Sequence, residues 1–317
     1  MNILITGVHG FVGSNLVKAM GGKHPVYGLD IVAPAVAGVV KTFTWEDLDA
    51  KRIPHMDVII HLAGKAHDTK NKSAAQLYFD INTGLTKRVF DYFLASGATK
   101  FVFFSSVKAA ANSVGDNEVL TEEVIPWPVG PYGESKIAAE KYINENFDMG
   151  ADASKRVYIL RPCMIHGPGN KGNLNLLYSV VCRGIPWPLG AFENRRSFTS
   201  IGNLCFVMEG LVTGNVPSGI YHMGDDEALS TNELISVICE SLDRKARIWH
   251  LPKGLMLGLA SVGGVLRLPL NRDRLQKLTE SYVVSNAKIK DALGVTKLPV
   301  SAREGLLVTL NSFKGKS

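Results

Sequence analysis

NILITGVHGFVG, residues 2–13, is the stretch of sequence that decides the fold. An apolar run is followed by Gly7, Gly10 and Gly13, and a segment with helical periodicity begins at Phe11. Glycines between a first strand and a first helix allow a tight turn, close helix packing and the approach of a pyrophosphate to backbone N–H groups. A glycine triplet alone is equally typical of an ordinary turn, but its position here favours a dinucleotide site. A Walker phosphate loop is excluded because no GK[ST] follows.

Short apolar runs alternate with helical patterns as far as about residue 160, which is typical of βαβ units. The expected strands are 2–6, 26–30, 58–62, 100–104 and 156–160, and the expected helices, with apolar residues at three- and four-residue spacing, are 11–20, 73–96 and 132–147. Because such crossovers are right-handed, the pattern predicts an α/β protein with a doubly wound parallel (Rossmann) sheet.

Beyond residue 165 the chain is richer in Gly- and Pro-containing loops, with expected helices near 231–242, 255–266 and 301–310. We therefore predict that residues 1–165 form an NAD-binding Rossmann domain. Residues 166–317 are predicted to form a smaller α/β part that binds the substrate, some segments of which return to the Rossmann core. The two parts are expected to pack around one cleft.

Composition narrows the class of protein. The chain carries 35 basic and 29 acidic residues, a net charge of +6 that favours an anionic ligand but is too scattered to predict nucleic-acid binding. Four cysteines without a CxxC pair, and histidines without HExxH spacing, predict no metal site and a reducing, cytoplasmic location.

No signal peptide is expected at the start. The longest uncharged apolar run, residues 254–266, is shorter than the ~20 residues of a membrane span, and we expect a buried or docking helix there.

Asp30 ends the second expected strand, 23 residues after Gly7. A carboxylate there can accept hydrogen bonds from both hydroxyls of an adenosine ribose and repels a 2′-phosphate. Because no arginine follows directly, we expect NAD rather than NADP as the cofactor. The alternative is a solvated turn aspartate.

Tyr132 and Lys136, in YGESK, are four residues apart and share one helix face. A nearby ammonium is expected to lower the pKa of the phenol and make it a general acid/base. YxxxK is common by chance, and it gains weight from Ser105 and Ser106, which end a strand at the edge where doubly wound sheets bind ligands.

These residues resemble the extended short-chain dehydrogenases/reductases, and within them the NAD-dependent epimerase/dehydratase group that acts on nucleotide sugars. The resemblance extends over nearly the whole chain and includes DVIIHLAG, INTGLTKRVFD, FFSSVKA, PYGESKIAAE, LRPCMIHGPGNKGN and LGVTKLPVSAREGL. It implies that Ser106, Tyr132 and Lys136 are catalytic. The cofactor contacts that it and the glycine loop imply are Gly7, Gly10, Phe11, Val12, Gly13, Asp30, Ile31, Leu62, Ala63, Gly64, Asn82, Ser105, Tyr132, Lys136 and Pro162.

For the substrate, the resemblance implies that Ser106 orients the sugar, that Asn173 contacts the nucleotide diphosphate and that Arg196 reaches the pyrophosphate, which an arginine can bind in a bidentate way. Without the resemblance, Arg196 would be interpreted as part of a solvated loop pair. Arg274, or Arg272 beside it, is a further candidate contact.

The chain also departs from the family's patterns. Val107 and Lys108 occupy the positions where sugar 4,6-dehydratases have an Asp-Glu pair, which makes a dehydratase improbable. Met164 and His166 replace the usual Asn and Tyr, which leaves the sugar contacts open.

The resemblance therefore implies an NAD-dependent UDP-sugar 4-epimerase of polysaccharide precursor synthesis, of the UDP-glucose or UDP-N-acetylglucosamine type, working through a transient 4-keto sugar. An NAD(P)H-dependent UDP-4-keto-sugar reductase is the alternative, and a non-catalytic nucleotide sensor a minor one. The family also implies a homodimer through the helices expected at 73–96 and 132–147.

Overall fold

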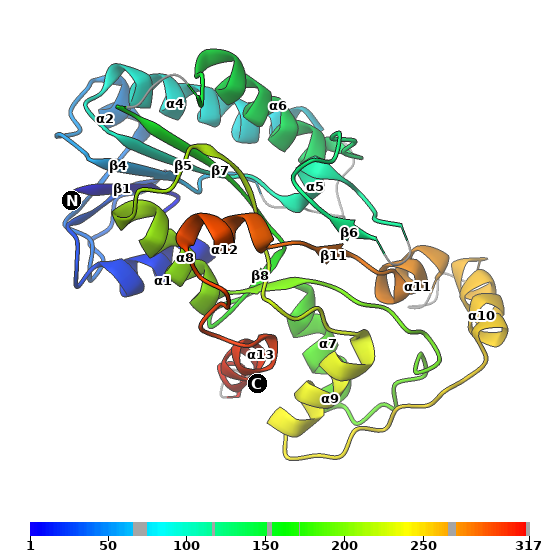
Figure 1. Ribbon diagram of the computed structural model, residues 1–317. Coiled ribbons are helices and arrows are strands. Elements are labelled where there is room, and N and C mark those ends of the chain that lie inside the picture. Colours follow the sequence, from blue (N-terminus) through cyan, green and yellow to red (C-terminus); the bar gives the residue numbers. More distant parts are fainter. Residues whose placement is uncertain (66–74, 116–117, 151–153, 171, 266–270, 315–317) are drawn as a thin grey trace.

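A seven-stranded parallel sheet forms the centre of the molecule. The computed structural model describes residues 1–65, 75–115, 118–150, 154–170, 172–265 and 271–314 (Figure 1). Every neighbouring pair in the sheet is parallel, and the order is β10-β7-β5-β4-β1-β2-β3. The strands are β1 (Ile3–Thr6), β2 (Val26–Leu29), β3 (Lys41–Phe43), β4 (Val58–His61), β5 (Lys100–Phe104), β7 (Arg156–Pro162) and β10 (Gly219–Met223). The predicted doubly wound Rossmann sheet is confirmed.

Helices cover both faces of this sheet (Figure 1). One face packs against α1 (Phe11–Met20), α8 (Ile201–Thr213) and α12 (Ala287–Leu293), and the other against α2 (Trp45–Asp49), α4 (Leu85–Ala95) and α6 (Pro131–Asn146). Successive side chains of β1 separate accordingly: Ile3 and Ile5 join the first core and Leu4 joins the second, all with no exposed surface. Strands buried on both faces are continuous apolar runs, as the sequence of β1 shows.

The single helix predicted at 73–96 is interrupted. Residues 73–74 lie outside the described residues, and the rest divides into α3 (Ala75–Tyr78), a π-helical turn η2 (Phe79–Gly84) and α4. The wider turn contains Asn82, whose side chain is completely buried and hydrogen-bonds across to the loop after β4. Single π-turns inside α-helices are frequent at functional sites.

Part of the second half returns to the sheet. β10 lies beside β7, with Gly219 opposite Tyr158 and Met223 opposite Pro162, and α8 covers the same sheet face as α1. The division at residue 165 therefore does not separate two independent sets of elements.

The remaining elements build a smaller unit at the carboxyl edge of the sheet. Two short parallel pairs, β8 (Met164–His166) with β9 (Phe198–Ser200) and β6 (Val119–Leu120) with β11 (Val283–Val284), lie there. The helices are α5 (Val107–Ala110), α7 (Asn173–Cys182), α9 (Thr231–Ser241), α10 (Lys253–Val265), α11 (Arg272–Thr279) and α13 (Ala302–Asn311). Helix α10 thus begins two residues before the predicted segment 255–266, whose last residue lies outside the described ones. None of the helices in the described part combines the length and apolarity required to cross a bilayer.

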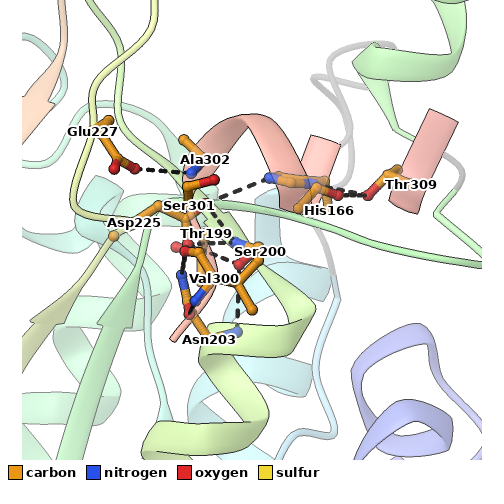
Figure 2. A network of polar contacts seen from close by, with 12 residues as sticks. His166, Thr199, Ser200, Asn203, Asp225, Glu227, Val300, Ser301, Ala302 and Thr309 are labelled. Atoms are coloured by element: carbon orange, nitrogen blue, oxygen red, sulfur yellow. Dashed lines mark hydrogen bonds and ion pairs between the residues drawn. The ribbon is translucent and has the colours of Figure 1, made fainter. Parts of the chain in front are cut away.

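A buried polar network attaches α13 to the rest of the chain (Figure 2). The Asp225 carboxylate accepts hydrogen bonds from the Ser200 backbone N–H and hydroxyl and from the Asn203 amide, at 2.7–3.0 Å. Asn203 in turn pairs with both backbone groups of Val300, directly before α13. The His166 ring reaches α13 itself through Thr309, at 2.9 Å. Buried polar groups hydrogen-bonded in this way hold these segments in one arrangement.

Candidate active site

The glycine loop follows β1 at the carboxyl edge of the sheet. Gly7 has a φ of +67°, which L side chains rarely adopt, and a Cβ there would lie 3.0 Å from the backbone N of Ala63. A Cβ on Gly13 would lie 2.5 Å from the carbonyl oxygen of Gly7, so only glycine lets α1 pack this closely on the loop. No side chain caps the N-terminus of α1, at Gly10. The positive end of this helix dipole can therefore receive a phosphate.

Asp30 lies beside the same loop. Its Oδ2 accepts a hydrogen bond from the His9 backbone N–H at 3.2 Å, and its Oδ1 accepts one from Ile31 at 2.8 Å. The carboxylate is half-buried, and Ile31 is largely exposed. The structure thus places the predicted ribose-binding carboxylate next to the predicted pyrophosphate loop, with Phe11 and Val12 half-buried in the first turn of α1.

The segment after β4 completes this edge. The Thr6 hydroxyl accepts hydrogen bonds from the backbone N–H groups of Leu62 and Ala63, at 3.2 and 3.0 Å, which holds the segment against β1. A Cβ on Gly64 would lie 2.9 Å from Oδ1 of Asn82 and 3.4 Å from Nζ of Lys136. Gly64 therefore lies where the segment after β4 meets Lys136.

Asn82 joins three elements. Its Oδ1 accepts from the Lys65 backbone N–H at 2.7 Å, and its amide donates to the Ser135 hydroxyl of α6 at 3.0 Å. The sequence resemblance predicted that Asn82 holds the loop beside the cofactor, and these contacts are consistent with that role.

Ser106, Tyr132 and Lys136 are brought together where β5 ends. Ser106 is the N-cap of α5, accepts from the Lys108 backbone N–H at 3.2 Å and hydrogen-bonds with Tyr132. The Lys136 ammonium is buried, donates to the Phe104 carbonyl at 2.8 Å and lies 5.0 Å from the centre of the Phe103 ring. Burial lowers the pKa of Lys136 to about 8, against the opposing effect of Glu140.

The pKa of Tyr132 is raised, not lowered. Burial is the largest cause, and the hydrogen bond to Ser106 opposes it without outweighing it. The prediction that Lys136 lowers the pKa of this phenol is therefore wrong for this structure. The physical reason is that the Lys136 ammonium is directed to the Phe104 carbonyl, while the phenol loses hydration.

A buried ion pair lies behind these residues, and sequence reasoning missed it. Glu140 of α6 accepts from Nε and Nη2 of Arg161 on β7, and also from the Ser105 hydroxyl. Ser105 is thus held by Glu140, and Pro162 follows Arg161 as the buried last residue of β7. Two signals could have found the pair: a Glu four residues after Lys136, and an Arg within an apolar strand.

The predicted substrate residues are placed unequally. Arg196 donates from Nη1 to the Lys277 carbonyl at 2.6 Å, and its Nη2 lies 4.0 Å from the Glu280 carboxylate. Asn173 is the first residue of α7 and is exposed, and no hydrogen bond joins it to Arg196 within the described residues. Arg274 belongs to α11, and its side chain lies outside the described residues.

Lys108 adds a cation that the sequence had singled out only as a departure. Its ammonium lies 4.3 Å from the centre of the Tyr282 ring and donates to the Asn112 carbonyl at 2.7 Å. Burial lowers its pKa, Glu280 opposes this, and Arg196 and Lys277 lower it further. The ammonium of Lys108, two residues after Ser106, and the guanidinium of Arg196 therefore both lie near the Glu280 carboxylate.

Comparison with known proteins identifies the family. The model of the NAD dependent epimerase/dehydratase family matches residues 3–209. The chain belongs to this family. It is 30% identical to a UDP-glucose 4-epimerase of Vibrio cholerae, over 98% of this chain and 95% of that one. It is 28% identical to the N-acetyl-alpha-D-glucosaminyl-diphospho-ditrans,octacis-undecaprenol 4-epimerase of Escherichia coli O157:H7, over 93% and 86%.

Solved structures of this family share the fold. A Thermotoga maritima UDP-glucose 4-epimerase with UDP-glucose superposes with a TM-score of 0.75 at 19% identity, covering 100% of this chain and 99% of that one. A Thermus thermophilus UDP-glucose 4-epimerase with NAD gives 0.73 at 22% identity and complete coverage of both chains. The chain is thus an NAD-dependent enzyme of the epimerase/dehydratase family. Its own residues fit this cofactor, because the cradle at Gly7 and Gly13 admits no side chain and Asp30 borders it.

Proposed function

We propose that the protein is a UDP-sugar 4-epimerase of polysaccharide precursor synthesis that keeps its NAD bound and acts on UDP-glucose or UDP-N-acetylglucosamine. The observation that carries this proposal is the meeting of Ser106, Tyr132 and Lys136 at the carboxyl end of β5, beside Gly64 of the cofactor edge. The absence of an Asp-Glu pair at Val107 and Lys108 argues against elimination of water.

In this mechanism Tyr132 takes the proton of the C4 hydroxyl, which Ser106 orients, and later returns it. Bound NAD would supply the acceptor, and afterwards the donor, of the C4 hydride. Lys136 lies one helical turn from Tyr132, with its ammonium held by the Phe104 carbonyl. If this ammonium turned toward the phenol when substrate binds, it would support the ionised form, because an opposite charge favours the charged state. Once C4 is a ketone, the sugar rotates while Arg196 holds its diphosphate. Reduction from the opposite face of the sugar then inverts the configuration at C4. Holding the remote diphosphate keeps the ketone from leaving.

The alternative is a 4-keto-sugar reductase built on the same residues. NAD(P)H would then be consumed, and Tyr132 would donate its proton to the new hydroxyl. A non-catalytic sensor is disfavoured because Tyr132 and Lys136 are both present.

A second substrate class has a specific observation in its favour. The Escherichia coli relative acts, by its name, on a sugar linked to undecaprenol through a diphosphate. The cations around Glu280, Lys108 and Arg196 among them, would meet the diphosphate of such a substrate as they would that of a UDP-sugar. We therefore include polyprenyl diphosphate sugars among the candidate substrates.

The decisive experiment is proton NMR of the purified protein with UDP-glucose and with UDP-N-acetylglucosamine, no cofactor being added. The galacto product is the expected result. Conversion only of a UDP-4-keto sugar with added NADH would establish the reductase instead. Binding of NAD without turnover of any nucleotide sugar or polyprenyl diphosphate sugar would favour the sensor.

We also propose a cytoplasmic homodimer formed through α4 and α6, as the family resemblance implies. The four cysteines are all free, which suits a reducing compartment. Gel filtration at micromolar concentration is expected to give the dimer, and a monomer would contradict it.

A further inference from the structure

Helix α10 (Lys253–Val265) exposes large aliphatic side chains that a soluble enzyme would ordinarily bury. Met256 and Ala260 face the protein core, but Leu255, Leu257, Leu259 and Val262 each retain half or more of their surface in solvent. After Lys253 the helix contains no charged residue. Such contiguous exposed apolar surface marks an interaction site.

The sequence that flanks α10 is basic. From Arg244 to Arg272 the sequence has no Asp or Glu, while its basic residues are Arg244, Lys245, Arg247, Lys253, Arg267 and Arg272. Lys253 begins the helix, and Arg272 donates to the Ser261 hydroxyl on its surface at 2.8 Å. Trp249, just before the helix, is 55% exposed. Exposed leucines beside a tryptophan and cations are the chemistry that recognises an anionic lipid surface.

We propose that α10, with Trp249, Lys253 and Arg272, docks the enzyme on the surface of an anionic lipid bilayer. The helix has 13 residues and lies in the interface, since ~20 are required to cross the hydrocarbon core. Leu255, Leu259 and Val262 share one exposed face of the helix by their spacing of four and three residues, and an apolar face of this kind can lie in a lipid surface.

The docking helix is connected to the substrate site. α10 packs against α11, and the carbonyl of Lys277 on α11 accepts the hydrogen bond from Arg196. Helix α11 thus connects α10, the proposed lipid-contacting helix, to Arg196, the arginine assigned to the substrate diphosphate. This arrangement suits a substrate in which a lipid carries the sugar diphosphate. That interpretation rests on the proposed function, whereas the docking of α10 on a lipid surface does not.

Vesicle sedimentation tests the proposal. The full-length enzyme is mixed with vesicles of phosphatidylglycerol and phosphatidylcholine, or of phosphatidylcholine alone, at low and high salt. Binding to the anionic vesicles alone, weakened by salt, is expected. Leu255→Ser with Leu259→Ser should lower this binding about tenfold or more, because two exposed leucines no longer enter the lipid, and turnover of a UDP-sugar should be unchanged. Leu176→Ser with Ile125→Ser, two side chains exposed elsewhere at 68% and 86%, is the matched control and should bind normally.

Three outcomes would overturn the docking. Wild-type protein that stays in solution with anionic vesicles, or α10 variants that sediment like the wild type, would do so. A wild-type dimer that becomes monomeric in the α10 variant would instead assign the helix to self-association. Vesicle binding by a protein that epimerises no sugar would leave the docking intact and overturn the proposed function.

Discussion

Arg161 and Glu140 form a buried ion pair directly behind the candidate active site. Nη2 of Arg161 lies 2.6 Å from Oε2 of Glu140, and their side chains are 2% and 1% exposed. The same carboxylate accepts from the Ser105 hydroxyl and lies one helical turn after Lys136. One pair thus connects the end of β5 with β7 and α6, the elements around the candidate catalytic residues.

Arg161→Met is expected to lower the free energy of unfolding by about 3–5 kcal/mol, because it leaves a buried carboxylate uncompensated. Urea unfolding measures the change. The control is Arg303→Met, which breaks an exposed pair with Glu240 and should cost no more than about 1 kcal/mol. Adding Glu140→Gln to Arg161→Met should recover part of the loss, and an unchanged loss would show that the pair is not the cause.

Gly13→Ala should weaken NAD binding and lower the free energy of unfolding by about 1–3 kcal/mol, since the new Cβ would meet the Gly7 and Val8 carbonyl oxygens at 2.5 and 2.7 Å. Calorimetric titration with NAD and thermal unfolding measure both effects. Gly22→Ala is the matched control, because a Cβ there has no neighbour within 4 Å. If the two variants bound NAD equally well and had the same stability, the glycine loop would have to shift far enough to accommodate the new Cβ.

Asp30→Asn should narrow the preference for NAD over NADP. Loss of the carboxylate removes charge-assisted hydrogen bonds to the ribose, so the Kd of NAD should rise about tenfold, and removes the repulsion of a 2′-phosphate. Titration of both cofactors into cofactor-free protein is the measurement. An unchanged ratio of the two Kd values would assign Asp30 only to its contacts with His9 and Ile31.

Tyr132→Phe should lower kcat by about 10² to 10⁴, the range for loss of a general acid/base. Tyr142→Phe, on the same helix but hydrogen-bonded to Asp91 away from the site, should retain wild-type turnover. Near wild-type turnover of Tyr132→Phe would remove the phenol from the mechanism.

Two buried histidines predict a loss of stability in acid. Burial lowers the pKa of His61 to about 3 and that of His222 to about 4, from an ordinary 6.5. Between those values and pH 6.5 the unfolded chain binds protons that the folded chain does not, so stability is complete above pH 6.5 and falls as the pH decreases. Each histidine contributes a slope of up to about 1.4 kcal/mol per pH unit.

Urea unfolding at pH 6.5, 5.5 and 4.5 measures this slope. His222→Leu should reduce it by the share of one histidine, since the substitution removes the titrating ring and leaves an apolar side chain at a fully buried position. The same slope in the variant would place the acid sensitivity elsewhere.

The elements with a strong local pattern could be predicted closely. Helix 11–20 and strand 100–104 have the predicted bounds, because amphipathic periodicity and β-branched or aromatic runs are local signals. Helix α8 was missed because Val207, Met208, Leu211 and their neighbours lie between the sheet and α12, so the helix is apolar on more than one side. Strand β3 has only three residues.

The candidate site likewise contains residues that local sequence signals could predict and contacts that they could not. The spacing of Tyr132 and Lys136 is a local signal, and so is Ser106 at a strand end. The pairing of Glu140 with Arg161, and the gathering of Lys108 and Arg196 around Glu280, join segments 21 to more than 80 residues apart. Such contacts depend on topology and leave no periodic trace in the sequence.

The return of β10 to the sheet has a consequence for biosynthesis. Until the chain has been synthesised beyond Met223, one edge of β7 has no neighbouring strand, and the sheet face that α8 covers stays bare while that helix is unfinished. Open edges and bare apolar faces pair with other chains. The nascent N-terminal half, although it carries most of the candidate cofactor residues, is therefore expected to need protection from aggregation until β10 has been synthesised.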